Sequence, residues 1–395
     1  MFDSIKSIFK DKVQFNESYL YQIGKPVWSN RSYTTFADKA YIKNVIANRS
    51  IRMISTCAAS IVPIIYKADG AESQIRNRIE KLLKEPNPIQ NGFEFFESIY
   101  TYRQLYGNAY ILASQVGRDS LPLEIYLLRP ERVKIIAGEQ FLPLGYRYTV
   151  ENKNIDYMLD SVTGKGNILH IKNFNPVSDW YGLSPVEAAS YSIDQHNQAA
   201  EWNQSLLQSG ARPSGVITVK DSEGKPSTLT REQFYQIKEM ISECFSGPKN
   251  SGRPMVLEGG LEWKEMSMSP KDMDFIESKN SSARDIALAF GVPPQLLGIP
   301  GDNTYNNLRE ARIALWEEVV LPMVDNTFAN ISRWINKNYE LDIEIKYDRS
   351  KISALASKSD SVWERLQNVT FMTTNEKREY VGLHPLVEQG NYTSS

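Results

Sequence analysis

Apolar residues recur at spacings of three and four in several early segments, which is the period of an amphipathic helix. Residues 44–61 carry such a stripe, and Pro63 follows the end of the segment. Alternating apolar runs bounded by turn residues predict short strands further along. The expected helices are 44–61, 73–84 and 93–105, and the expected strands are 123–128, 132–136, 146–150 and 167–171. The first part of the chain therefore predicts an α+β fold.

Two longer helices are predicted in the middle of the chain, and both are unusually polar. The first begins at Ser184–Pro185 and runs to Gly210, and the second begins at Ser269–Pro270 and is closed by Gly291. Each carries a thin apolar line on a surface rich in Ser, Asn and Gln. The lines consist of Ile193, Ala200 and Leu207 in the first helix and of Ile276, Ala283, Ala287 and Phe290 in the second. Such narrow stripes need neighbours, and packing between identical subunits would supply them.

The segment between these two helices predicts a small β-α-β unit. A strand precedes a capping box at Thr230–Gln233, whose helix runs to Phe245. A hairpin turns at Gly259–Gly260 and supplies the remaining strands.

A long helix is predicted over residues 306–338. Pro322 lies inside it, and proline removes one hydrogen bond and clashes with the preceding turn, so a kink is expected there. Shorter helices are expected at 360–368 and 375–381, followed by a polar tail.

A break rich in proline and glycine separates the second polar helix from the long helix. Gly291 can adopt the left-handed conformation that ends a helix, and Pro293–Pro294 cannot continue one. The turn-forming residues that follow have little to bury, which predicts an exposed loop that touches a partner, although a plain connector has the same composition. The candidate loop consists of Gly298, Ile299, Pro300, Gly301, Asp302, Asn303, Thr304, Tyr305 and Asn306.

Composition adds limits to this picture. The 395 residues are 41% hydrophobic, which suffices for globular cores and suggests two or three domains. The longest apolar run, Ala58–Tyr66, is far shorter than the ~18 residues that a membrane span needs. The N-terminus lacks the apolar core of a secretory signal. Cys57 and Cys244 lie in apolar segments and suit a reducing compartment.

Catalytic and metal-binding motifs are weak. His170, His196 and His384 have no metal-like spacing. The segment Gly247–Arg253 has the glycines of a phosphate-binding loop, but Arg253 and Pro254 replace its Lys and Ser/Thr, and it lies between a helix and a strand instead of a strand and a helix. The sequence therefore predicts no catalytic residue, no cofactor, no metal site and no enzyme activity.

Ten short segments occur in an order that is typical of one family. They are the helix end at Val62–Pro63, LLKEPNP with the Phe-rich helix after it, YGNAY, LLRPERVKI, ILHIKNF, YGLSPVEAA, GARPSGVI, SGRPMVLEGGLEW, DIALAFGVPPQLLG with the following Tyr305–Asn306, and MTTNEKREYVGL. With them, nearly the whole chain resembles the portal proteins of tailed bacteriophages of the long-tailed type and their prophage and gene-transfer-agent relatives. One departure is Asn307–Arg309, where many relatives carry a Glu-Gln-like pair.

The resemblance implies a portal-like, multidomain subunit that assembles into a ring, usually of twelve copies, at one capsid vertex. DNA is packaged and ejected through such a ring. The implied parts are an α/β wing at 1–185, a two-helix stem at 186–209 and 269–291, a β-α-β clip at 210–268, a tunnel loop at 292–306, a long kinked helix with a return to the wing at 307–345, and a helical crown and tail at 346–395.

The resemblance also implies partners and a location. The partners would be other copies of the chain, the major capsid protein, the terminase large subunit, a head-tail adaptor and double-stranded DNA, with no membrane. The protein would reside at the portal vertex of the virion after assembly in the bacterial cytoplasm. Two alternatives stay open, namely a nucleotide-handling α/β enzyme that uses Lys249 and Arg253, and a monomeric DNA-binding adaptor.

Charge distinguishes a DNA conduit from a DNA clamp. The net charge is −2, and tight nucleic-acid binders neutralise phosphates with a basic face. We therefore expect the assembled protein to bind duplex DNA no more tightly than the ~10⁻⁶ to 10⁻⁴ M of non-specific contacts, with a shallow salt dependence. Fluorescence anisotropy measures this affinity, and nanomolar binding at about 0.15 M salt would favour the adaptor instead.

Overall fold

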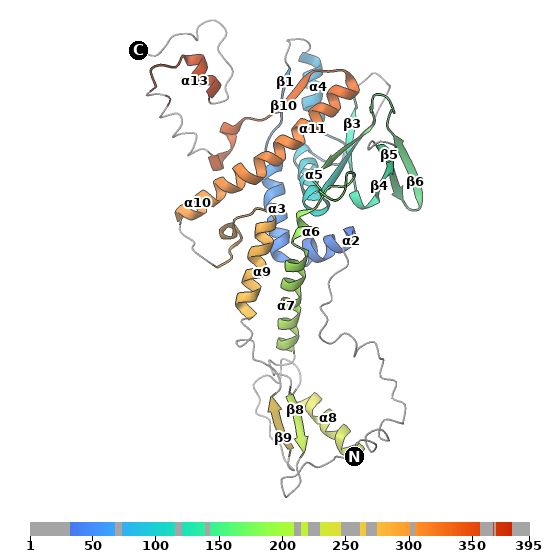
Figure 1. Ribbon diagram of the computed structural model, residues 1–395, viewed down its shortest axis with the longest axis vertical. Helices are drawn as coiled ribbons and strands as arrows, with labels where there is room; N and C mark the ends of the chain where they lie inside the picture. The colour runs from blue at the N-terminus through green and yellow to red at the C-terminus, as the bar shows by residue number, and fades with distance from the viewer. Residues whose placement is uncertain are drawn as a thin grey trace. The chain divides into compact units, whose positions relative to one another are not determined.

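The computed structural model describes residues 32–67, 73–114, 121–138, 143–208, 215–219, 230–245, 261–265, 275–300, 305–355, 366 and 369–380. All of them belong to the larger of two units of the chain, Arg31–Ser395. The helices are α2 (Tyr33–Phe36), α3 (Val45–Ala59), α4 (Ser73–Lys84), α5 (Gly92–Tyr106), α6 (Pro185–Ala188), α7 (Ser190–Gln208), α8 (Arg231–Phe245), α9 (Phe275–Ala289), α10 (Tyr305–Ala314), α11 (Leu321–Tyr339) and α13 (Thr374–Tyr380), with π-helical segments η2 (Ala37–Ile42) and η6 (Leu315–Val320) and a 3-10 turn η5 (Pro294–Leu297) (Figure 1). Among these described helices none is long and apolar enough to cross a membrane.

The described strands form small antiparallel sheets. Their orders are β3-β2-β7, β4-β5-β6, β1-β10 and β8-β9. The strands are β1 (Ile64–Lys67), β2 (Asn108–Ser114), β3 (Glu124–Leu128), β4 (Val133–Ala137), β5 (Pro143–Val150), β6 (Lys153–Met158), β7 (Ile168–Lys172), β8 (Gly215–Val219), β9 (Leu261–Glu265) and β10 (Ile343–Lys346). The mixture of helices and sheets is the expected α+β fold, and the strands predicted before residue 172 all form.

The main core lies where α3, α5 and α11 meet. The apolar stripe of α3 contributes Ile51 and Ile54, both 0% exposed. Phe96 of α5 meets Phe328 of α11 edge to face, with ring centroids 5.7 Å apart. Local signals set the ends of α5, because Asn91 and Glu94 form a reciprocal capping box and Gly107 closes the helix with φ 71°.

A buried arginine ties this core together. Arg103 of α5 is 6% exposed and donates from Nη1 to the Thr327 hydroxyl at 2.8 Å and from Nη2 to Asn173 Oδ1 at 3.0 Å. Burial lowers the pKa of Arg103 to about 10, so the guanidinium stays charged at neutral pH. Neutral oxygens from a neighbouring helix and a loop therefore take the place of water around this charge.

The interior proline lies beside an irregularity in the predicted long helix. The chain forms the π-helical segment η6 up to Val320, and Pro322 lies in the first turn of α11. The kink itself stays a prediction. The amide of Leu321 accordingly donates to the carbonyl of Trp316, five residues back. The wider π turn gives the proline ring room that an α turn would not.

The first polar helix also differs from the prediction. It is divided into α6 and α7, because Ala189 leaves helical geometry with φ −85° and ψ 0°. The side chain of Ser184 caps α6 by accepting from the amide of Val186, not from Glu187 as a capping box requires. The predicted start of the second polar helix at Ser269–Pro270 lies outside the described residues. The capping box at Thr230–Gln233 is confirmed in both directions.

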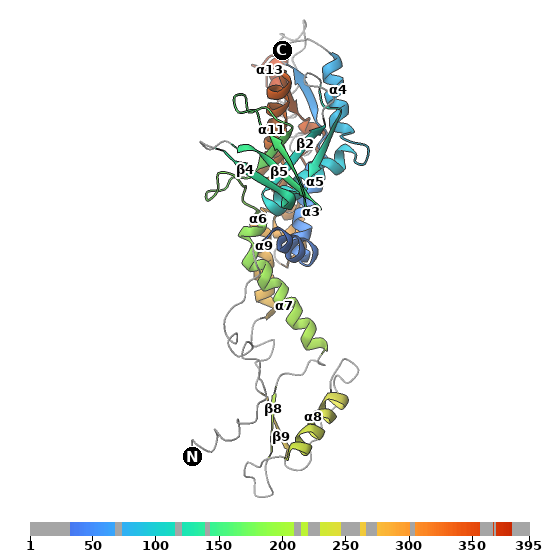
Figure 2. The ribbon, with the colours of Figure 1, turned by 90° about the vertical axis from the view of Figure 1, so that its right-hand side faces the viewer.

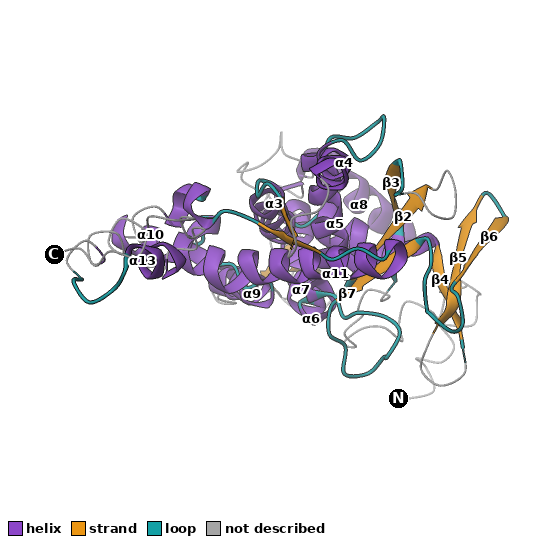
Figure 3. Cartoon of the chain, turned by 90° about the horizontal axis from the view of Figure 1, so that it is seen from above, coloured by secondary structure: helices purple, strands orange, loops and turns teal. Residues whose placement is uncertain are grey.

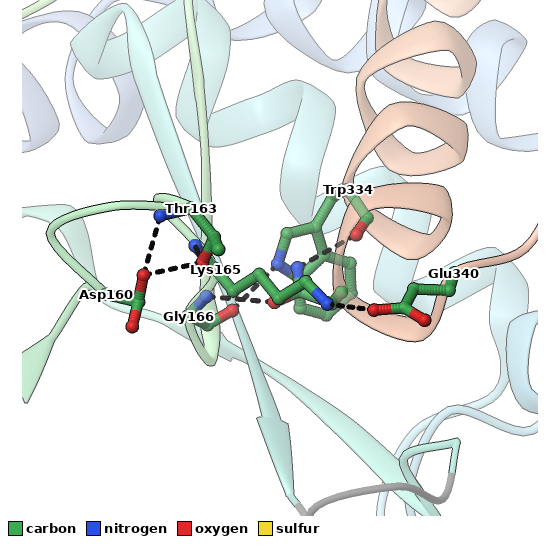
Figure 4. A network of polar contacts seen from close by, with 7 residues as sticks. Asp160, Thr163, Lys165, Gly166, Trp334 and Glu340 are labelled. Atoms are coloured by element: carbon green, nitrogen blue, oxygen red, sulfur yellow. Dashed lines mark hydrogen bonds and ion pairs between the residues drawn. The ribbon is translucent and has the colours of Figure 1, made fainter.

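A polar network joins the turn before β7 to the end of α11 (Figure 4). Lys165 Nζ pairs with Glu340 Oε1 at 2.7 Å, and the indole of Trp334 donates to the carbonyl of Gly166 at 3.1 Å. Asp160 accepts from Thr163 and shapes the turn itself. Seen from above, this part of α11 lies beside β7 (Figure 3). The network therefore connects the β-rich part of the chain to the long helix.

His170 occupies a closed aromatic site on β7. Its ring stacks on Tyr110 with centroids 4.4 Å apart, and Nε2 donates to Asn108 Oδ1 at 2.9 Å. Burial, with a smaller effect from Lys172, lowers the pKa of His170 to about 3. A neutral imidazole is therefore part of the folded state.

This site makes stability depend on pH. The pKa of His170 in the folded state lies below the ordinary value of 6.5, so below pH 6.5 the unfolded chain binds a proton at this group and the folded chain does not. The stability of the fold therefore falls as the pH drops below 6.5. We expect a loss of roughly 1–2 kcal/mol from this group between pH 6.5 and pH 5. His170→Gln should flatten this part of the profile in urea titrations. An identical slope in the variant would assign the acid sensitivity to other groups, such as His196.

Candidate functional site

Helices α7 and α9 run side by side and form the candidate assembly surface (Figures 1 and 2). Their contact is built from small and polar side chains, including a bond from Gln195 Nε2 to Ser278 Oγ at 3.3 Å. On α9, Ser282 is 1% exposed, and its hydroxyl donates a hydrogen bond to the carbonyl of Ser278 at 3.0 Å. Small side chains allow the two helices to approach closely.

The apolar lines of these helices are not covered as the sequence predicted. Ile193, Ala283, Ala287 and Phe290 are already buried within a single chain. The expectation that only a neighbouring subunit covers them is therefore wrong, because α3 and η2 flank the helix pair and supply the missing contacts. The sequence offered no signal for this, since α3 precedes α9 by more than two hundred residues.

Other residues of the pair face outward. Ala200 is exposed, and Ile276 is 77% exposed. Leu288 of α9, which the predicted line did not include, is 78% exposed. The side chain of Leu207 lies outside the described residues.

A buried polar cluster fixes α7 on the beginning of α3. Asn44 caps α3 through Oδ1, which accepts from Ala47 N at 2.9 Å, and donates from Nδ2 to Asn197 Oδ1 at 2.9 Å. The same amide nitrogen lies 3.3 Å from His196 Nδ1. Burial, followed by the charge of Lys279, lowers the pKa of His196. Asn44 thus both caps α3 and bonds to α7, and the second role could not be predicted from the neighbouring sequence.

The break after α9 has the predicted helix end. Gly291 has φ 67°, and Val292 N donates to the carbonyl of Ala287 at 2.9 Å. The prolines form the short turn η5, and Gly298 reverses the chain with φ 73°.

The candidate loop that follows is not uniformly exposed. Gly298 and Pro300 are exposed, whereas Ile299 is 4% exposed and packs against Ala283 and Ala287. The predicted loop therefore had something to bury. Gly301–Thr304 lie outside the described residues, and Tyr305–Asn306 already begin α10.

No reactive constellation accompanies these surfaces. Within the described ranges, no group of three or more His, Cys, Asp or Glu side chains could hold a metal ion. Burial lowers the pKa of His170 and of His196 and raises the pKa of the Cys57 thiol. Lys249 and Arg253, the residues of the enzyme alternative, lie outside the described residues.

Comparisons with known proteins agree on one family. The model of the family described as phage portal protein matches residues 46–382. A protein of Rickettsia felis is 44% identical over 382 residues, covering 97% of both chains. The portal protein of Enterobacteria phage HK97 is 24% identical over 297 residues, covering 73% of this chain and 66% of that protein. A chain from the neck of a native gene transfer agent particle, computed with C12 symmetry, superposes with a TM-score of 0.69 at 37% identity, covering 92% of this chain and 96% of the other.

The burial of the α9 line leads to a prediction with a matched pair of variants. Ala287 is 0% exposed, so Ala287→Asp places an unpaired charge in the core, and we expect a loss of about 3–5 kcal/mol in unfolding free energy. Measured on the dissociated subunit, Ile276→Asp should change that free energy by only about 0.5 kcal/mol, because the side chain is 77% exposed within one chain. Circular dichroism during thermal unfolding compares them. Equal melting temperatures would contradict the intrachain packing.

Proposed function

This chain belongs to the phage portal protein family, and we propose that it forms a ring of twelve subunits that conducts DNA at one vertex of a phage or gene-transfer-agent capsid. The observation that carries the proposal is the likeness, at 37% identity over 92% of the chain, to a protein in a particle neck computed with C12 symmetry. Identity at this level over nearly the whole chain supports the proposal that this chain assembles in the same way.

A ring constrains the subunit surface. In a cyclic assembly each copy uses two different patches, one toward each neighbour. The outward side chains Ile276 and Leu288 supply apolar area on α9 that a neighbouring copy would bury. Burying both would contribute about 3–6 kcal/mol per interface before the costs of association. We propose these two residues, in place of the buried members of the predicted line, as part of the stem contact.

The channel would be lined in part by the connection between α9 and α10. Asp302, Asn303 and Thr304 carry short polar groups that can meet phosphates through transient hydrogen bonds. The net charge of −2 favours passage of DNA over retention. Two features therefore support a conduit: the short polar groups of the connection, which can form transient hydrogen bonds with phosphates, and the lack of a net positive charge on the chain.

We assign roles to the other segments of the chain from its membership in the portal family. Residues 1–185 would form the wing and 210–268 the clip, the latter as docking site for the terminase large subunit and the head-tail adaptor. The ring would sit among copies of the major capsid protein, after assembly in the bacterial cytoplasm. Portal proteins are structural, so the hydrolysis of ATP during packaging would belong to the terminase and not to this chain.

The assembly makes a measurable prediction. The purified protein should have a mass about twelve times that of one chain by size-exclusion chromatography with light scattering. Leu288→Asp should shift the population toward small, folded species, because a charge would have to be desolvated at the interface. Leu288→Met, which keeps the volume and apolarity, serves as the control and should assemble normally.

Two results would argue against the ring. A wild-type protein that stays monomeric at all accessible concentrations would favour the adaptor alternative. ATP hydrolysis by the purified chain, abolished by Lys249→Ala, would favour the enzyme.

A further inference from the structure

Ile299 is a buried residue in the middle of a connection. It is 4% exposed and packs on Ala283 and Ala287 of α9, with Ile46 of α3 and Leu297 beside them. Residues in connecting segments usually face water, because their backbone groups need it. The connection is therefore attached to α9 at Ile299.

The seat for this side chain is built from small residues. Ala283 and Ala287 are four positions apart, so they lie on one face of α9, and their small side chains pack with Ile299 in one buried cluster. Gly298 turns the chain back toward the helix with φ 73°. The backbone then closes the turn, with Ile299 N donating to the carbonyl of Pro294 at 3.3 Å. A longer side chain at either alanine would compete with Ile299 for the same space.

A second contact holds the next residue along the connection. Arg284 Nη2 donates to the carbonyl of Pro300 at 2.6 Å. A hydrogen bond from a guanidinium is stronger than one between neutral groups. Arg284 follows Ala283 directly, so one turn of α9 holds Ile299 by apolar packing and Pro300 by a polar bond.

From these contacts we infer that Ile299 and Arg284 are positioning residues, which fix the place and direction in which the connection leaves α9. Helix α9 packs on both α7 and α3, so the beginning of the connection, up to Pro300, moves with these helices as one body. The inference rests on the proposed function in one respect, which is that the residues after Pro300 would meet DNA. Arg284 and Ile299 would then act on DNA indirectly, by setting where those residues begin.

Hydrogen exchange tests the anchor without any DNA. In the wild type, the amides of Gly298 and Ile299 should exchange slowly, because both donate hydrogen bonds. Ile299→Ala should accelerate their exchange by roughly tenfold or more, and Arg284→Ala by several-fold, while Arg284→Lys, which still offers a donor, should restore most of the protection. The conservative Ile299→Val and the removal of an exposed arginine elsewhere, Arg333→Ala, are the controls. Unchanged exchange in both alanine variants would overturn the anchor.

Particle production then separates the anchor from the channel. We expect Arg284→Ala to assemble rings of normal mass and to yield particles with reduced DNA content, with rescue by Arg284→Lys. Deletion of residues 301–304 should lower DNA content whether or not the anchor exists, so it reports on the channel alone. Reduced DNA in the deletion with normal DNA and normal exchange in Arg284→Ala would reject the anchor and keep the channel. Normal DNA in the deletion, with accelerated exchange in Arg284→Ala, would keep the anchor as a structural contact and reject its role toward DNA.

Discussion

Close packing against the small side chains of α9 is the constraint on which the candidate site depends. Ala283 and Ala287 are both buried, and each leaves room that another element occupies. One face of a single helix therefore sets the position of the connection that follows it and of the helices beside it. Because protein interiors are packed as densely as organic crystals, a change of even a methyl group on this face would be felt in all of these elements.

Buried polar contacts set the angles between the elements that surround this helix. Arg103 joins α5 to α11, and Asn44 joins α3 to α7. Hydrophobic contact alone is non-directional, whereas each of these groups must find its partners or lose the free energy of desolvation. Such contacts favour one arrangement of the helices over the many that would bury similar apolar area. The proposed ring would require a single arrangement, because each subunit would have to match identical neighbours.

Two departures from regular helix geometry interrupt helices that the sequence predicted to be continuous. The π-helical segment before Pro322 and the break at Ala189 both occur where a long helix predicted from periodicity would have continued. In each case the apolar period itself persists through the irregularity, which is why the periodicity did not reveal it. Periodicity also did not reveal that Leu288 is exposed, although Leu288 directly follows the buried Ala287 in the chain.

The sequence by itself determined the elements that depend on local chemistry. The capping box at Thr230–Gln233 and the left-handed Gly291 follow from neighbouring residues, and the order of short motifs identified the family. The tertiary structure alone decided which apolar residues are available to a partner. Ala287 and Ile276 looked equivalent along one helix, yet the first is buried by α3 and the connection, and the second is exposed. Burial depends on elements that are distant in sequence, so no local pattern could distinguish Ala287 from Ile276. For the same reason the sequence did not predict that Ile299 packs on α9.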